Sequence, residues 1–150
     1  SSGTDAVTRV LIDTSPDLRA QFLSSGASHL DAVLFTHDHA DQCHGIDDLR
    51  ALAYRMKKLI PVYLDAPTHQ SLTHRFAYCF EGRGGYPPIL DARLALEPLE
   101  PITVEGAGGA IEFLPVDQEH GRIRSLGFRF GSFGYCNDVN ILPEESLELT

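Results

Sequence analysis

Two histidines and an aspartate lie within five residues of one another in the segment Thr36-His-Asp-His-Ala-Asp-Gln-Cys-His-Gly45. His37 and His39 are two residues apart, so in extended or irregular backbone their side chains can point to the same side. Asp41 adds a hard oxygen donor to the two imidazoles. Such a set can bind Zn²⁺ or a similar divalent ion. The alternative is a solvated loop, since single histidines often have no role, but the clustering favours a metal site.

These side chains need an element that delivers them together. The apolar run at residues 31–35 precedes the motif and is typical of a short buried strand. A strand ending there places His37 at its carboxyl end, where the side chains of a loop can converge.

The remaining pattern predicts an α/β layer followed by a strand-rich half. Strands are expected at residues 7–12 and 60–64, and helices at 18–26, 45–56 and 68–78. Further strands are expected at 101–105 and 110–116, and a hairpin at 126–130 and 133–136 with residues 131–132 as its turn. The polar cluster 117–121 lies between these pairs, at the expected end of a strand.

Composition limits the class of protein. The 150 residues suggest one domain, spanning 1–150, with a real core. A formal net charge of −9 disfavours nucleic acid as a partner. No apolar run approaches the ~20 residues that cross a bilayer, and no signal peptide is visible, so no membrane partner is expected. The three cysteines form no CxxC pair, which favours a reducing cytoplasm.

The glycine- and proline-rich segment 82–88 breaks both periodicities and is predicted to be a loop. One interpretation is a plain surface connection, because loops vary widely. The other is a lid that faces the substrate, with Arg83 meeting an anionic group and Tyr86 packing on it.

The pattern Thr-His-x-His-x-Asp resembles the signature of the metallo-β-lactamase-fold hydrolase superfamily. The longer segment 37–50 resembles the branch that contains the phosphonate-pathway cyclic phosphodiesterase, and the resemblance extends from about Val10 to the end of the chain. It implies an α/β fold, a four-layer αββα sandwich. It also implies hydrolysis that depends on one or two ions, Zn²⁺ or Mn²⁺, with a metal-activated water as nucleophile.

The resemblance assigns roles to individual residues. His120 matches the third histidine of the first metal site, and Asp138 matches the aspartate that bridges both metals. Asp41 is expected to serve the second metal and to orient the attacking water. Asp13 matches an aspartate that supports the site from behind by hydrogen bonding. The alternatives are that His120 and Asp13 belong to turns and that Asp138 ends a hairpin.

Two departures from the family concern the second metal. Gln42 stands where the family commonly has histidine, and a neutral amide oxygen is a much weaker zinc ligand. The family's last second-site histidine has no counterpart, because none of the other four histidines matches it: His29, His44, His69 and His74. We therefore expect a weakly held second ion. The missing histidine and a missing glycine-rich opening suggest a sequence incomplete at both ends, a fragment or the ordered part of a longer chain.

The functional expectation is a metal-dependent phosphodiesterase that acts on a small cyclic phosphate ester, an anionic substrate. Two alternatives stay open. The same site could hydrolyse a carboxyl ester, thioester or lactam, or the chain could be a degenerate metal-binding scaffold without activity. A homodimer is a further possibility.

Overall fold

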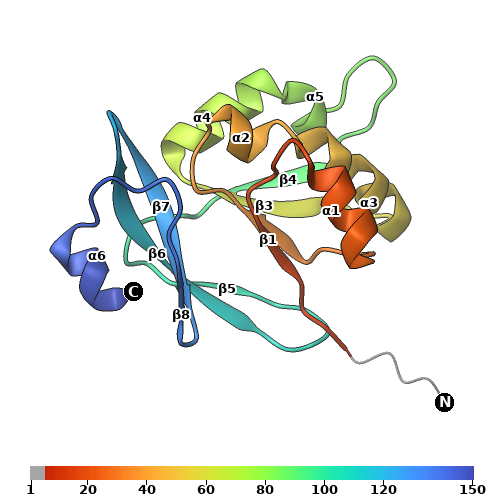
Figure 1. Cartoon of the computed structure of the whole chain (residues 1–150). Coiled ribbons are helices and arrows are strands. Elements are labelled where there is room, and N and C mark those ends of the chain that lie inside the picture. The colour runs from red at the N-terminus through yellow and green to blue at the C-terminus, as the bar shows by residue number, and fades with distance from the viewer. Residues whose placement is uncertain (1–5) are drawn as a thin grey trace.

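The computed structural model describes residues 6–150, which form two four-stranded sheets that face each other (Figure 1). The first sheet is parallel, in the order β1-β2-β3-β4. Its strands are β1 (Val10–Ile12), β2 (Ala32–Leu34), β3 (Ile60–Leu64) and β4 (Leu90–Leu94). The second is antiparallel, with β5 (Ile102–Val104), β6 (Ile111–His120), β7 (Ile123–Phe130) and β8 (Phe133–Tyr135) in sequence order.

Helices cover the outer faces of both sheets (Figure 1). Those on the parallel sheet are α1 (Leu18–Ser25), α2 (Ala40–Cys43), the short 3₁₀ helix η1 (Ile46–Asp48), α3 (Leu49–Met56), α4 (Ala66–Arg75) and α5 (Ala77–Phe80). On the other side, α6 (Glu144–Leu149) packs against β6. This arrangement confirms the predicted αββα sandwich.

The alternation of side chains along β2 explains the two apolar layers. Val33 points into the layer between the helices and the parallel sheet, together with Leu49 and Leu72. Ala32 and Leu34, its neighbours on either side, point into the layer between the two sheets, where Phe113 and Phe128 pack against them. All three β2 side chains are fully buried, so β2 lies at the centre of the fold and fixes the loop that follows it.

Several predicted elements are confirmed: the strand at 60–64, the helix that ends at Gly26, and the hairpin of β7 and β8. Other bounds differ. The helix expected at 45–56 begins as the 3₁₀ helix η1, and the one expected at 68–78 begins at Ala66 and breaks at Phe76.

The C-terminal half contains the main corrections. The polar cluster predicted to end a strand at 117–121 lies mostly inside β6, which continues to His120 and pairs with β7 along its length. The strand β4 and the helix α6 were not expected. Charged residues interrupt the apolar pattern of β4, and α6 is short and acidic.

None of the helices in residues 6–150 combines the length and the apolar character that a membrane crossing requires. Cys43 and Cys79 are buried free thiols, and Cys136 is an exposed one.

Candidate metal centre

The loop between β2 and α2 lies where the two sheets meet. Within this loop, the carbonyl of Thr36 accepts a hydrogen bond from the N–H of Leu126 in β7, at 3.0 Å. On its other side, the N–H of Thr14 donates to the carbonyl of Gln42 at 2.7 Å, and the N–H of Gly45 donates back to Thr14 at 3.0 Å. The loop is therefore anchored to the second sheet and to the segment after β1.

Gly45 is required by this anchoring. A Cβ atom at that position would lie 1.9 Å from the carbonyl oxygen of Ser15. Only glycine permits the two backbone segments to approach so closely.

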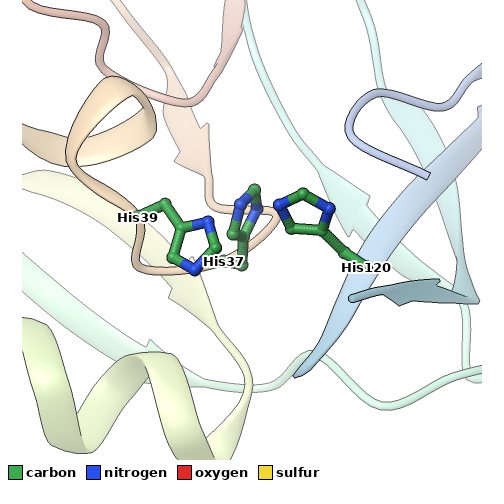
Figure 2. A group of neighbouring side chains, drawn as sticks. All are labelled: His37, His39 and His120. Atoms are coloured by element: carbon green, nitrogen blue, oxygen red, sulfur yellow. The ribbon is translucent and has the colours of Figure 1, made fainter. Parts of the chain in front are cut away.

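Three imidazoles converge at this loop. His37 follows β2, His39 is the N-cap residue of α2, and His120 is the last residue of β6. Their ring centroids are 4.6, 5.2 and 5.0 Å apart, and one nitrogen of each lies within 4.8 Å of the others. Figure 2 shows the rings gathered, with His120 approaching from the strand opposite the loop. The structure thus brings together the histidines that the sequence assigned to one metal.

The Nε2 atom of His37 has a free lone pair that can bind an ion. This atom is buried and has no hydrogen-bond partner. Burial lowers the pKa of His37, and the neighbouring imidazoles of His39 and His120 lower that pKa further, so the ring is neutral near pH 7. A neutral imidazole nitrogen is what a zinc ion binds.

Asp13 and Thr36 determine which nitrogen of His37 carries the proton. Asp13 accepts hydrogen bonds from the N–H and the hydroxyl of Thr36, each at 2.8 Å. The Thr36 hydroxyl also lies 2.8 Å from Nδ1 of His37. When Asp13 is ionised, the single proton of the hydroxyl goes to its carboxylate, so the hydroxyl can only accept from Nδ1–H, which leaves Nε2 unprotonated. The structure places Asp13 behind His37, where support of this kind is needed.

Asp13 itself is held under strain. Its backbone is left-handed, with φ 61°, a conformation that aspartate tolerates better than most residues. Burial raises the pKa of Asp13 to about 7, against the opposing effect of its hydrogen bonds with Thr36. An ionised Asp13 is therefore costly in the absence of a nearby cation.

Asp41 and Asp138 do not belong to the three-histidine cluster, but they lie beside it. Asp138 Oδ2 is 3.9 Å from Nε2 of His37. The side-chain nitrogen of Gln42 donates to Asp41 at 3.0 Å and to Asp138 at 2.6 Å. Gln42 was expected as a possible ligand through its amide oxygen. In the structure its nitrogen faces the carboxylates, and its buried oxygen has no partner.

The segment that carries Asp138 is tied to β6. The buried amide of Gln118 donates to the hydroxyl of Ser125 at 3.1 Å and to the carbonyl of Asn137 at 3.2 Å. The N–H of Asn140 donates to the carbonyl of Glu119 at 2.8 Å. These bonds hold the chain on both sides of Asp138, whose own backbone is left-handed with φ 48°.

Arg75, in α4, was not anticipated as a residue of the site. Its guanidinium donates to the carbonyl of Asp38 at 2.8 Å and lies 3.1 Å from His44 Nε2 and 3.4 Å from Cys43 Sγ. It therefore ties the metal loop to α4. Nothing in the local sequence around Arg75 indicates this contact, which spans more than thirty positions.

A cavity of about 420 Å³ opens beside His37. Its walls come from the start of α4, the segment after β4 and the strand β7. They are largely apolar, and include Pro67, Leu96, Ile123 and Leu126. Arg124, an exposed side chain paired with Asp117, also lines it. A cavity with apolar walls and a few polar groups next to a reactive centre is typical of a substrate site.

The proposed lid residues lie elsewhere. Arg83 pairs with Glu81 at 3.4 Å, and Tyr86 packs against the guanidinium of Arg50 at 5.5 Å. Neither lines the cavity beside His37, so the idea of a substrate-facing Arg83 and Tyr86 is not supported.

The residues present fit one divalent ion. Three imidazoles, one of them with a buried unpartnered nitrogen, match a zinc-type site that keeps further positions open. The second position of the family does not fit as well. Within residues 6–150, this histidine cluster is the sole group of three or more candidate ligands, and Asp41 and Asp138 are joined by an amide.

Residues 8–150 match the family model described as the beta-lactamase superfamily domain. The chain therefore belongs to the metallo-β-lactamase superfamily, as the motif around His37 predicted. A solved structure described as a new diphosphatase from the PhnP family is 34% identical, with a TM-score of 0.80 over 93% of this chain. It supports the predicted PhnP-like branch.

Two further proteins are similar. A metallo-β-lactamase fold protein, YhfI from Bacillus subtilis, is 19% identical over 83% of this chain and 47% of its own, with a TM-score of 0.54, which shows the fold alone. A protein named octanoyltransferase from Porphyromonas gingivalis is 36% identical over 97% of this chain. The chain spans only 28% of that protein and 51% of the PhnP-family structure.

Proposed function

We propose that this chain carries the active centre of a metal-dependent hydrolase that cleaves a small phosphate ester. The observation that carries the proposal is the convergence of His37, His39 and His120 within 4.8 Å beside a cavity of about 420 Å³. Membership of the superfamily and similarity to a PhnP-family diphosphatase support the choice of phosphate chemistry.

In this proposal each residue of the metal centre has its own role. The three imidazoles hold the ion, and Thr36 with Asp13 keeps Nε2 of His37 free for it. When bound, a divalent ion supplies an acidified water and polarises the ester to be cleaved. Asp138, 3.9 Å from His37 Nε2, would accept a proton from such a water, and Asp41 would orient it.

An anionic substrate is compatible with this acidic chain. The ion offsets the charge of the phosphate, although the chain carries a formal net charge of −9. Arg124 adds a guanidinium to the wall of the cavity, where it can meet a second anionic group.

A second candidate is hydrolysis of an acyl ester or thioester. Two observations favour it: the apolar walls formed by Leu96, Ile123 and Leu126, and the similarity to a protein named octanoyltransferase. An acyl chain would bury more apolar surface in that cavity than a small phosphate ester would.

The test uses the full-length protein loaded with Zn²⁺ or Mn²⁺. Turnover of bis(p-nitrophenyl) phosphate is compared with turnover of p-nitrophenyl octanoate, and His39→Ala serves as the control for metal dependence. Phosphodiester cleavage that His39→Ala abolishes supports the main proposal. Cleavage of the octanoate ester alone supports the second candidate. Bound metal with no turnover of either substrate contradicts both and favours the degenerate scaffold.

A further inference from the structure

We infer that the side-chain amide of Gln42 takes the place of a second metal ion, so that the centre binds one ion tightly. The inference rests on the proposed metal site of His37, His39 and His120. Its own observation is separate: one amide nitrogen lies 3.0 Å from Asp41 and 2.6 Å from Asp138.

The amide satisfies the two carboxylates with its own hydrogens. A primary amide nitrogen carries two N–H donors, and each carboxylate here takes one of them. Hydrogen bonds to carboxylates are among the stronger ones in proteins. The positive end of the Gln42 amide dipole therefore holds the two negative carboxylates together. A bridging cation would have the same effect.

The orientation of the amide follows from charge. If the Gln42 amide were reversed, its oxygen would stand at 2.6 and 3.0 Å from two carboxylate oxygens, which repel it. That reversed orientation becomes favourable only with a cation between the three groups. The two states are therefore exclusive: the nitrogen faces the carboxylates without a second ion, and the oxygen faces them with one.

Two properties of the residues favour the state without a second ion. Gln42 is 6% exposed, so its amide cannot easily leave the carboxylates for water. The donors on offer are two carboxylates and one neutral amide oxygen, whereas zinc prefers nitrogen and sulfur ligands. Gln42 is then a positioning residue that holds Asp138 at 3.9 Å from His37 Nε2.

The alternative is that a second ion binds beside Asp41 and Gln42, and the fold contains a cavity there. A mainly polar cavity of about 210 Å³ lies beside Asp41 and Gln42, with Asp13, Tyr135 and Asn137 also in its lining. A side chain that entered this cavity with an imidazole would supply the missing ligand. A second ion would then displace the amide nitrogen.

The test measures zinc stoichiometry in the full-length protein. Metal-free wild type, Gln42→His and Ser24→His are titrated with Zn²⁺ by calorimetry, and bound ions are counted by native mass spectrometry. Ser24 is exposed on α1, so Ser24→His controls for an added surface imidazole. We expect one tight site in the wild type and in Ser24→His, and two in Gln42→His. Two equally tight sites in the wild type, unchanged by Gln42→His, overturn the inference.

A second variant covers the case in which Gln42→His does not fold. Gln42→Glu keeps the shape but removes both N–H donors, so three carboxylates converge and a cation is needed between them. We expect the affinity for a second ion, measured with Mn²⁺, to rise about tenfold or more. An unchanged second-site affinity contradicts the role given to Gln42. Absence of any zinc binding instead contradicts the proposed function, so the two failures are distinguishable.

Discussion

The hydroxyl of Thr36 donates to the buried carboxylate of Asp13 at 2.8 Å and lies at the same distance from Nδ1 of His37. This relationship links the aspartate after β1 to the protonation of a histidine through the hydroxyl between them. With Asp13 ionised, the carboxylate takes the one proton of the hydroxyl, and Nε2 of the histidine is left free for an ion.

The first prediction concerns Asp13→Asn. An amide at this position can donate to the Thr36 hydroxyl, which then donates to Nδ1 of His37 and moves the imidazole proton to Nε2. We expect zinc affinity to fall about 10- to 100-fold, with little change in fold. Calorimetric zinc titration measures the change, and circular dichroism checks the fold. Wild-type affinity in Asp13→Asn would show that Thr36 and Asp13 do not set the tautomer.

The second prediction concerns pH and the metal-free protein. Burial raises the pKa of Asp13 from 3.8 to about 7, so the folded state holds this proton more tightly than the unfolded state does. The stabilisation from the protonated form is therefore complete below pH 3.8 and is lost as the pH rises through about 7. Each unit of the pKa shift corresponds to roughly 1.4 kcal/mol.

Urea unfolding of metal-free wild type and Asp13→Asn, across this range of pH, isolates the contribution of Asp13. The wild type should lose stability relative to the variant between about pH 4 and about pH 7. Parallel curves for the two proteins would mean that Asp13 is ionised in the fold throughout.

The third prediction concerns Arg75. Its guanidinium holds the carbonyl of Asp38 and contacts His44, so Arg75→Ala should loosen the loop that carries His37 and His39. We expect zinc affinity to fall about tenfold and the free energy of unfolding to fall by about 1 kcal/mol. Arg75→Lys, which keeps the charge with fewer donors, should give an intermediate affinity. Full affinity in Arg75→Ala would leave Arg75 as a surface residue only.

The fourth prediction tests the contact between the sheets. Phe128 is fully buried between them, so Phe128→Ala should cost about 3–5 kcal/mol in the free energy of unfolding. Phe133, on the neighbouring strand, is 68% exposed, and Phe133→Ala should change that free energy by about 0.5 kcal/mol or less. Chemical denaturation compares the two variants. Equal losses would contradict the assignment of Phe128 to the core.

The sequence predicts the parts of the site that are local. His37, His39 and Asp41 share one segment, and the apolar run before them predicts β2. His120 and Asp138 were assigned through the family resemblance, and the structure brings both to the same place. Contacts between segments that are distant in the chain could not be predicted from the sequence. Arg75 reaches the metal loop across the fold, and the direction of the Gln42 amide depends on two carboxylates at once.

The bounds of the C-terminal strands also depend on pairing between segments, which the local sequence does not predict. The polar residues 117–119 were expected to end a strand, but β7 pairs with them and β6 continues through them to His120. Tertiary pairing overrode the local pattern. The short α6 has no amphipathic pattern long enough to detect.

The fifth prediction concerns His39→Ala and the metal content that depends on it. The purified full-length protein and the His39→Ala variant are loaded with zinc, dialysed and analysed by elemental analysis. If His37, His39 and His120 hold the ion, the wild type retains about one zinc per chain, and the variant, with too few imidazoles for tight binding, retains almost none. Equal metal content in the two proteins would contradict the metal centre on which the whole account depends.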